Sequence, residues 1–310
     1  VLIALMALFK TYLGSIIDDK VWKGIAEGLN YGLGFMVIFM LHFTVATKQP
    51  AMTAARFAEA VEKTPQGKSV NMKLAQLLVD VFRSQSIAVL GNVLIAMGLA
   101  ALIAFGYQYK TGEPLMNADQ IAYQLHSIDP FAGTLWFAAI AGVWLFCSGI
   151  ISGYFDNRSN YLNMRMRLTQ HPLLKKLMSE KTRVKFANYM HENYGSLIGN
   201  LCFGMLLGIT GVVGYLTHLP LDIRHVAFSS ANLGYSAVSG QFAYPFFLQC
   251  IGFVLLIGLV NLMVSVSLTL WVALRSLNTE IDSWWAIWHE VYQIVRKRPL
   301  SLFFPVQLDK

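Results

Sequence analysis

A stretch without a single charged side chain, residues 195–217, constrains the fold of this chain more than any other feature. At about 1.5 Å of rise per residue, a helix of this length crosses a hydrocarbon layer of about 30 Å. The composition agrees, because 55% of the 310 residues are hydrophobic and 13% are charged. In a soluble domain about a quarter of all residues are charged. The sequence therefore predicts an integral membrane protein.

Small residues within 195–217 are ordered by the helical period of about 100° per residue. One face is predicted to carry Asn200, Gly204, Gly208 and Gly211. The nearly opposite face carries Gly195 and Gly199. Because small residues allow helix backbones to approach closely in lipid, and an amide can hydrogen-bond across the contact, we predict that this segment is the central packing helix of a bundle.

The predicted fold is an all-α polytopic membrane bundle of about six transmembrane helices. Five full spans are predicted at residues 24–46, 86–107, 131–154, 195–217 and 245–274. The apolar run 1–9 predicts a sixth span that is incomplete at its start. Lysine and arginine gather in 48–83, 158–185 and 275–310, while the alternate connections hold only Lys110 or Arg224. This positive-inside alternation places the basic connections and the C-terminus in the cytoplasm of a bacterial inner membrane.

Two segments need a separate interpretation. Residues 219–240 are apolar enough to span, but a full crossing would put the C-terminal charges outside, so we predict a re-entrant or surface helix. After the bundle (1–274), the unit 275–310 is predicted to be a cytoplasmic interfacial helix and tail. In 278–298, Trp284, Trp285 and Trp288 alternate with polar residues, which is typical of a helix at the headgroup level.

A possible parallel repeat relates residues 24–107 to 131–215. The strings LGNVLIAM and IGNLCFGM align with an offset of 108 residues, which pairs Asn92 with Asn200 and Ala96 with Gly204. Asn92 and Asn200 are therefore predicted on matched packing faces. Chance similarity between two helices rich in small residues is the alternative interpretation.

Polar residues at the ends of spans are the candidate site residues, because ionisable groups are costly in lipid. They are His42, Lys48, Asp156, Asn157, Arg158, Asp222, Arg224 and His225. Each group also has a structural interpretation. His42 can be a hydrogen-bonded structural histidine, residues 156–158 can close a helix end, and Asp222 can contact Arg224. We expect no metal, because Pro220 interrupts the helix that would align His218 with Asp222 and His225. No cofactor fingerprint and no catalytic nucleophile is recognisable.

Four strings carry a resemblance to a known family: LHFTVATKQPAMT at 41–53, ISGYFDNR at 151–158, RLTQHPLL at 167–174 and LPLDIRHVAFSSANLG at 219–234. They resemble a bacterial membrane-protein family that carries the name site-specific recombinase. The resemblance covers roughly residues 41–298, and it implies DNA recombination only through that name. No catalytic residue of the family can be placed on this sequence.

These observations favour a membrane transport or lipid-handling function. A non-enzymatic membrane scaffold and a DNA recombinase are the alternatives. An enzyme is less expected than a non-enzyme. The expected partners are membrane lipids, together with a protein partner or a second copy of the chain. We do not expect nucleic acid as a partner. The net charge of +7 is already explained by basic residues that mark the cytoplasmic side of the membrane.

Overall fold

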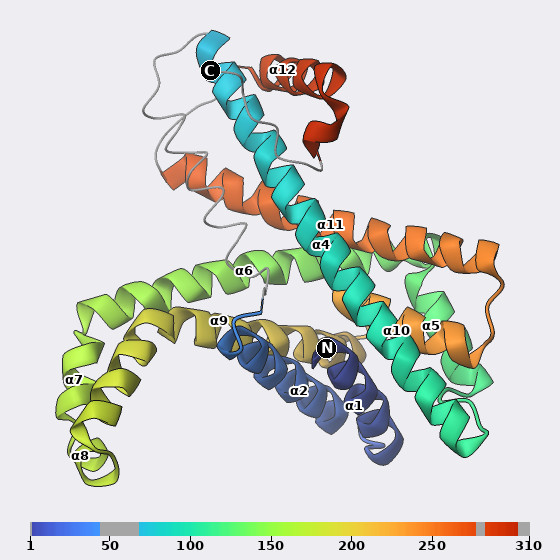
Figure 1. Ribbon diagram of the computed structural model, residues 1–310, viewed down its shortest axis with the longest axis horizontal. Helices are drawn as coiled ribbons and strands as arrows, with labels where there is room; N and C mark the ends of the chain where they lie inside the picture. Colours follow the sequence, from blue (N-terminus) through green and yellow to red (C-terminus); the bar gives the residue numbers. More distant parts are fainter. Residues whose placement is uncertain (1, 44–67, 277–282, 303–310) are drawn as a thin grey trace.

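The computed structural model describes residues 2–43, 68–276 and 283–302, and within these ranges every regular element is a helix (Figure 1). The all-α prediction is therefore confirmed. The elements are α1 (Leu2–Ile16), α2 (Lys20–Met40), α4 (Lys68–Thr111), α5 (Ala118–Ile128), η1 (Pro130–Ala132), α6 (Thr134–Tyr161), α7 (Met164–Gln170), α8 (Pro172–Leu177), α9 (Glu180–Thr217), α10 (Val226–Ser239), α11 (Tyr244–Ser276), α12 (Trp284–Lys297) and η2 (Pro299–Leu302).

Four helices, α4, α6, α9 and α11, are long and apolar enough to cross a membrane, and α1 is a shorter apolar helix. The predicted span 24–46 differs from the structure, because α2 ends at Met40. There the N–H of Leu41 bonds back to Val37, and His42 adopts a left-handed backbone with a φ of 58°. A non-glycine residue in this conformation does not continue a right-handed helix.

Helix α9 lies between α2 and α6 and uses one glycine face for each. A Cβ on Gly204 would meet the backbone of Gly32 in α2, and a Cβ on Gly208 would meet the backbone of Gly28. Asn200, one turn before Gly204, is fully buried. The backbones of α2 and α9 are therefore in direct contact, as small residues permit.

The second glycine face of α9 lies against α6. A Cβ on Gly195 would meet the carbonyl of Ser152 and the side chain of Asp156, and one on Gly199 would lie 2.9 Å from the Cβ of Ser152. A Cβ added to Gly211, by contrast, would meet no atom of the described residues within 4 Å, so the role of Gly211 in packing stays a prediction. The contact with α2 continues instead through Val212, which a Cβ on Gly24 would meet. Rows of residues four apart, such as Gly208 and Val212, are inclined to the helix axis.

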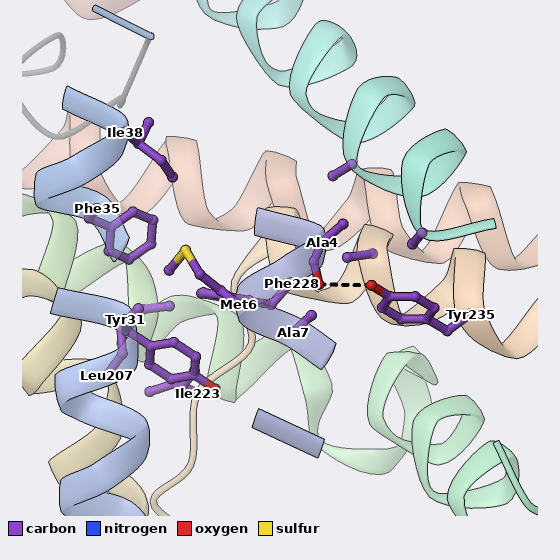
Figure 2. Packing of buried hydrophobic residues seen from close by; sticks show 14 of the residues in the cluster. Ala4, Met6, Ala7, Tyr31, Phe35, Ile38, Leu207, Ile223, Phe228 and Tyr235 are labelled. Atoms are coloured by element: carbon purple, nitrogen blue, oxygen red, sulfur yellow. Dashed lines mark hydrogen bonds between the residues drawn. The ribbon is translucent and has the colours of Figure 1, made fainter. Parts of the chain in front are cut away.

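The segment after α9 turns back into the bundle. His218 ends α9 with a left-handed backbone, and residues 219–225 form no helix before α10 begins at Val226. Helix α10 packs on α4, α11, α1 and α5, and most of its residues are buried. The hydroxyl of Tyr235 donates to the carbonyl of Ala4 at 2.8 Å, which joins α10 to α1 (Figure 2). Helix α10 is thus enclosed by protein.

The structure leaves the repeat between residues 24–107 and 131–215 a prediction. The two helices that carry the aligned strings, α4 and α9, pack against different partners. Ala100 of α4 lies against Gly234 of α10, whereas the equivalent Gly208 of α9 lies against α2. Gly91 has open space around it, whereas the equivalent Gly199 meets Ser152. Helix α12 folds back on the first turns of α4, where Ile287 is fully buried in a small apolar cluster.

Candidate functional site

Asn261 of α11 holds the start of α10 in the middle of the bundle. Its Oδ1 accepts from the N–H of Val226 at 3.1 Å. Its Nδ2 donates to the carbonyl of Ala138 in α6 at 2.7 Å and to the carbonyl of Arg224 at 3.0 Å. Asn261 is 3% exposed, so one buried amide satisfies polar backbone groups that would be costly to leave unpaired.

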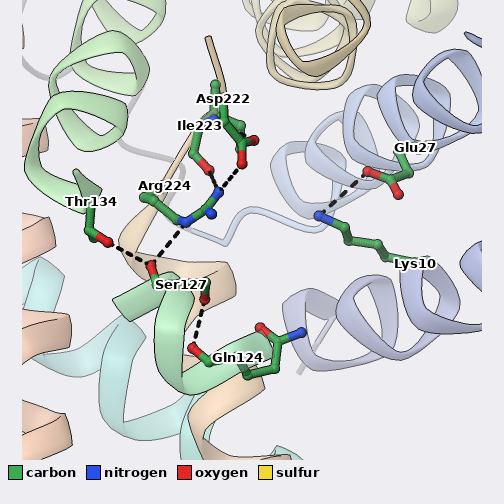
Figure 3. Close-up of polar contacts among 8 residues, drawn as sticks. All are labelled: Lys10, Glu27, Gln124, Ser127, Thr134, Asp222, Ile223 and Arg224. Carbon is green, nitrogen blue, oxygen red and sulfur yellow. Dashed lines mark hydrogen bonds and ion pairs between the residues drawn. The ribbon is translucent and has the colours of Figure 1, made fainter. Parts of the chain in front are cut away.

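Arg224 and Asp222 fix the segment before α10, as Figure 3 shows. The Nη1 of Arg224 lies 2.6 Å from the Oδ2 of Asp222, and its Nε donates at 2.9 Å to the carbonyl of Ser127 in α5. The backbone N–H of Arg224 donates to Phe137, whose ring also lies under the guanidinium. Asp222 also accepts from the N–H of Ile223. These contacts tie residues 222–225 to α5 and α6.

His225 lies directly before α10 in an aromatic setting. The rings of Phe203, Phe228 and Phe35 lie 5.5, 6.0 and 6.1 Å from its ring, centroid to centroid. Its Nδ1 is buried and has no hydrogen-bond partner within the described ranges. An imidazole nitrogen in this position can donate or accept a hydrogen bond, depending on its tautomer. It is therefore available to a small polar molecule.

A cavity of about 70 Å³, here called the polar cavity, is lined by His225. Its polar lining consists of Gln85, Asn92, His225, Asn261 and Ser265. Ser265 is fully buried, and its Oγ has no hydrogen-bond partner within the part of the chain that the structure describes. The volume exceeds the roughly 10–15 Å³ that one buried water needs. The polar cavity can therefore hold a few water molecules or one small solute.

A second cavity of about 30 Å³, here called the charged cavity, is also lined by His225. It is lined by Lys10 of α1, Tyr31 of α2 and Arg224, and His225 borders both cavities. The Nζ of Lys10 lies 3.4 Å from a carboxylate oxygen of Glu27 (Figure 3). The charged cavity therefore has two cationic side chains among its polar lining, whereas the polar lining of the first cavity is neutral apart from the imidazole.

The structure brings only part of the predicted site together. Asp222, Arg224 and His225 are neighbours, and Asn92 lines the polar cavity with His225. His42 lies in an exposed turn directly after α2, at the end of that helix, and it lines neither cavity. The candidate Lys48 lies outside the described residues.

The group at the end of the third predicted span stands apart from both cavities. The Oδ1 of Asp156 accepts from the N–H of Gly195 at 3.0 Å, which joins α6 to α9. Arg158 donates to the hydroxyl of Tyr154, and Asn157 is exposed. These contacts belong to helix packing and to a helix end, which is the structural interpretation given above.

Sequence reasoning missed Gln85, Asn261 and Ser265 as lining residues. The sequence contained a signal for them, namely polar side chains within long apolar segments. An amide or a hydroxyl inside an apolar helix needs a hydrogen-bond partner. The sequence did not indicate that α4 and α11 place these groups beside His225.

Comparison with known proteins adds one finding. The family model described as "Site-specific recombinase" matches residues 1–305 of the chain. No curated protein and no solved structure matches the chain.

Proposed function

The chain belongs to the site-specific recombinase family, and from this membership and the architecture above we propose that it is a membrane transport protein whose solute passes through the polar cavity beside His225. The observation that carries the proposal is the non-helical segment 219–225, which leads to a helix start inside an apolar bundle. In lipid, such backbone is tolerated only where protein buries it or where it lines a wet cavity.

The lining of the polar cavity supports binding of a small polar solute. The start of α10 carries the partial positive charge of a helix N-terminus, and Val226 and Ala227 line the cavity there. The Nδ1 of His225 and the Oγ of Ser265 supply hydrogen-bonding groups that the described protein atoms leave unused. Transporters place their solute sites at interrupted helices of this kind, near the middle of the membrane.

A path to the polar cavity is proposed through the charged cavity, since His225 is the side chain common to both. Lys10 and Arg224 would attract an anionic or strongly dipolar solute there, although Glu27 and Asp222 each offset one of these charges. In this proposal the basic connections and the C-terminus face the cytoplasm of a bacterial inner membrane, and His225 separates the two sides of the path.

Water access to Ser265 tests the proposal. The three cysteines Cys147, Cys202 and Cys250 are first replaced by alanine, and Ser265→Cys is then introduced. In proteoliposomes, the anionic reagent methanethiosulfonate ethylsulfonate is expected to label Cys at 265, with mass spectrometry as the readout. The matched control is Ser152→Cys, because Ser152 is equally buried but lies against Gly199 and lines neither cavity.

The expected result is labelling at 265 and protection at 152. Protection at both positions would mean that water does not reach the polar cavity, and the transport proposal would fail. Equal labelling at both would show that the bundle opens generally rather than along a path.

DNA recombination is the second candidate function, because the family's description names it. The structure supplies a basic surface for it at one end of the molecule, where α7, α8 and the start of α9 project (Figure 1). Its exposed cations are Arg165, Arg167, Lys175, Lys176, Lys181 and Lys185. Sequence-dependent DNA binding that persists at about 0.2 M salt would favour this candidate, because nonspecific attraction to cations fades with salt.

A further inference from the structure

Helices α4, α11 and α12 enclose an apolar groove of about 540 Å³, here called the α12 groove. Its wall is formed by aliphatic and aromatic side chains, and Ser267 is the polar exception among its lining residues. Trp284 and Trp288 line it from α12, and Phe82 lines it from α4. The volume falls within the range of about 300–1,000 Å³ that small-molecule pockets occupy.

The groove ends beside a basic rim, defined here as Arg275, Arg296 and Lys297. Arg275 follows the lining residue Leu274, and Arg296 follows the lining residue Val295, so the backbones of both basic residues lie at the end of the lining on α11 and α12. All three rim residues are exposed. Of the acidic residues that the structure describes on these helices, Asp80 is paired with Arg83, and Glu290 is half-buried on α12. The rim therefore carries an excess of positive charge.

We propose that the α12 groove binds an acyl chain of an anionic phospholipid, with the phosphate of its headgroup on the basic rim. The groove supplies apolar surface to the methylenes, and each buried methylene strengthens binding by roughly fourfold. The rim selects a negative headgroup, because lysine and arginine at the membrane surface attract anionic lipid. Tryptophan prefers the headgroup level, where the chain and the phosphate meet.

This site is independent of the transport proposal. Leu262 lines both the α12 groove and the polar cavity, but none of the polar groups of that cavity lines the groove. A lipid held in the groove would fix α12 against α4 and α11 whether or not a solute moves through the bundle.

Native mass spectrometry of the full chain in detergent tests the proposal, with palmitoyl-oleoyl phosphatidylglycerol and the phosphatidylcholine of the same chains as probes. We expect the first lipid to bind at least about tenfold more tightly, since only its headgroup carries net negative charge. Ser267→Trp places an indole in the groove. It is expected to weaken the binding of phosphatidylglycerol by about tenfold, because the indole excludes two or more methylenes of the acyl chain from the groove. Leu259→Trp, on an exposed part of α11 outside the groove, is expected to change nothing.

A charge variant tests the rim without altering the groove. Arg296→Gln combined with Lys297→Gln is expected to remove the preference for phosphatidylglycerol. The control Lys175→Gln with Lys176→Gln removes the same charge from α8 and is expected to keep the preference. Equal binding of both lipids to the wild-type chain would overturn the proposal. It would also be overturned if Ser267→Trp bound phosphatidylglycerol as tightly as Leu259→Trp, because the lipid would then bind outside the groove.

Discussion

Replacing Gly208 by alanine is expected to separate α2 from α9. The added Cβ would meet the backbone of Gly28 and would lie 2.6 Å from the carbonyl oxygen of Gly24. Carbon and oxygen atoms of this kind need about 3.4 Å or more, so the two helices must move apart by roughly 1 Å. The atoms in the way belong to the backbone, so no side-chain rotation can relieve the contact.

The magnitude follows from two opposing terms. Overpacking costs about 1–3 kcal/mol, and loss of the close contact along the neighbouring turns adds to it. Alanine gains at most about 1 kcal/mol of helix propensity over glycine. We therefore expect Gly208→Ala to lower the free energy of unfolding by about 1–3 kcal/mol.

Gly211→Ala is the matched control on the same helix. Its Cβ meets no atom within 4 Å, so only the propensity term remains, and the free energy of unfolding should rise by up to about 1 kcal/mol. The measurement is a reversible unfolding titration in mixed detergent micelles, followed by the far-ultraviolet circular dichroism of the helices. Changes of the same sign and size in the two variants would refute the direct contact between α2 and α9.

Two further substitutions test the remaining architecture. Asn261→Leu should lower the free energy of unfolding by about 2–5 kcal/mol, because the N–H of Val226 and the carbonyls of Ala138 and Arg224 lose their partner. The same unfolding titration measures this change. A change no larger than that of the exposed Asn157→Leu would count against the role of Asn261. Ile287→Ala removes the fully buried side chain between α12 and α4 and should cost about 2–4 kcal/mol. Protease cleavage between α11 and α12 should quicken accordingly, and an unchanged cleavage rate would show that α12 is held by other contacts.

Local patterns were readable from the sequence because they depend only on the helical period. The uncharged run ending at Thr217 lies within α9, and the tryptophan-rich segment contains α12. The position of His225 was not readable in the same way. Its surroundings come from Phe35, Phe203 and Asn261, which are distant in sequence and meet only through the packing of α2, α9 and α11.

Gly211 shows where a helical wheel stops being sufficient. A wheel projects residues along a straight axis and places Gly211 with Gly204. The contacts follow residues four apart on both helices instead, with Gly208 and Val212 on α9 against Gly28 and Gly24 on α2. Rows of residues four apart are inclined to the helix axis. A wheel ignores this inclination, so it identifies the face of a helix without deciding which residues on that face are in contact.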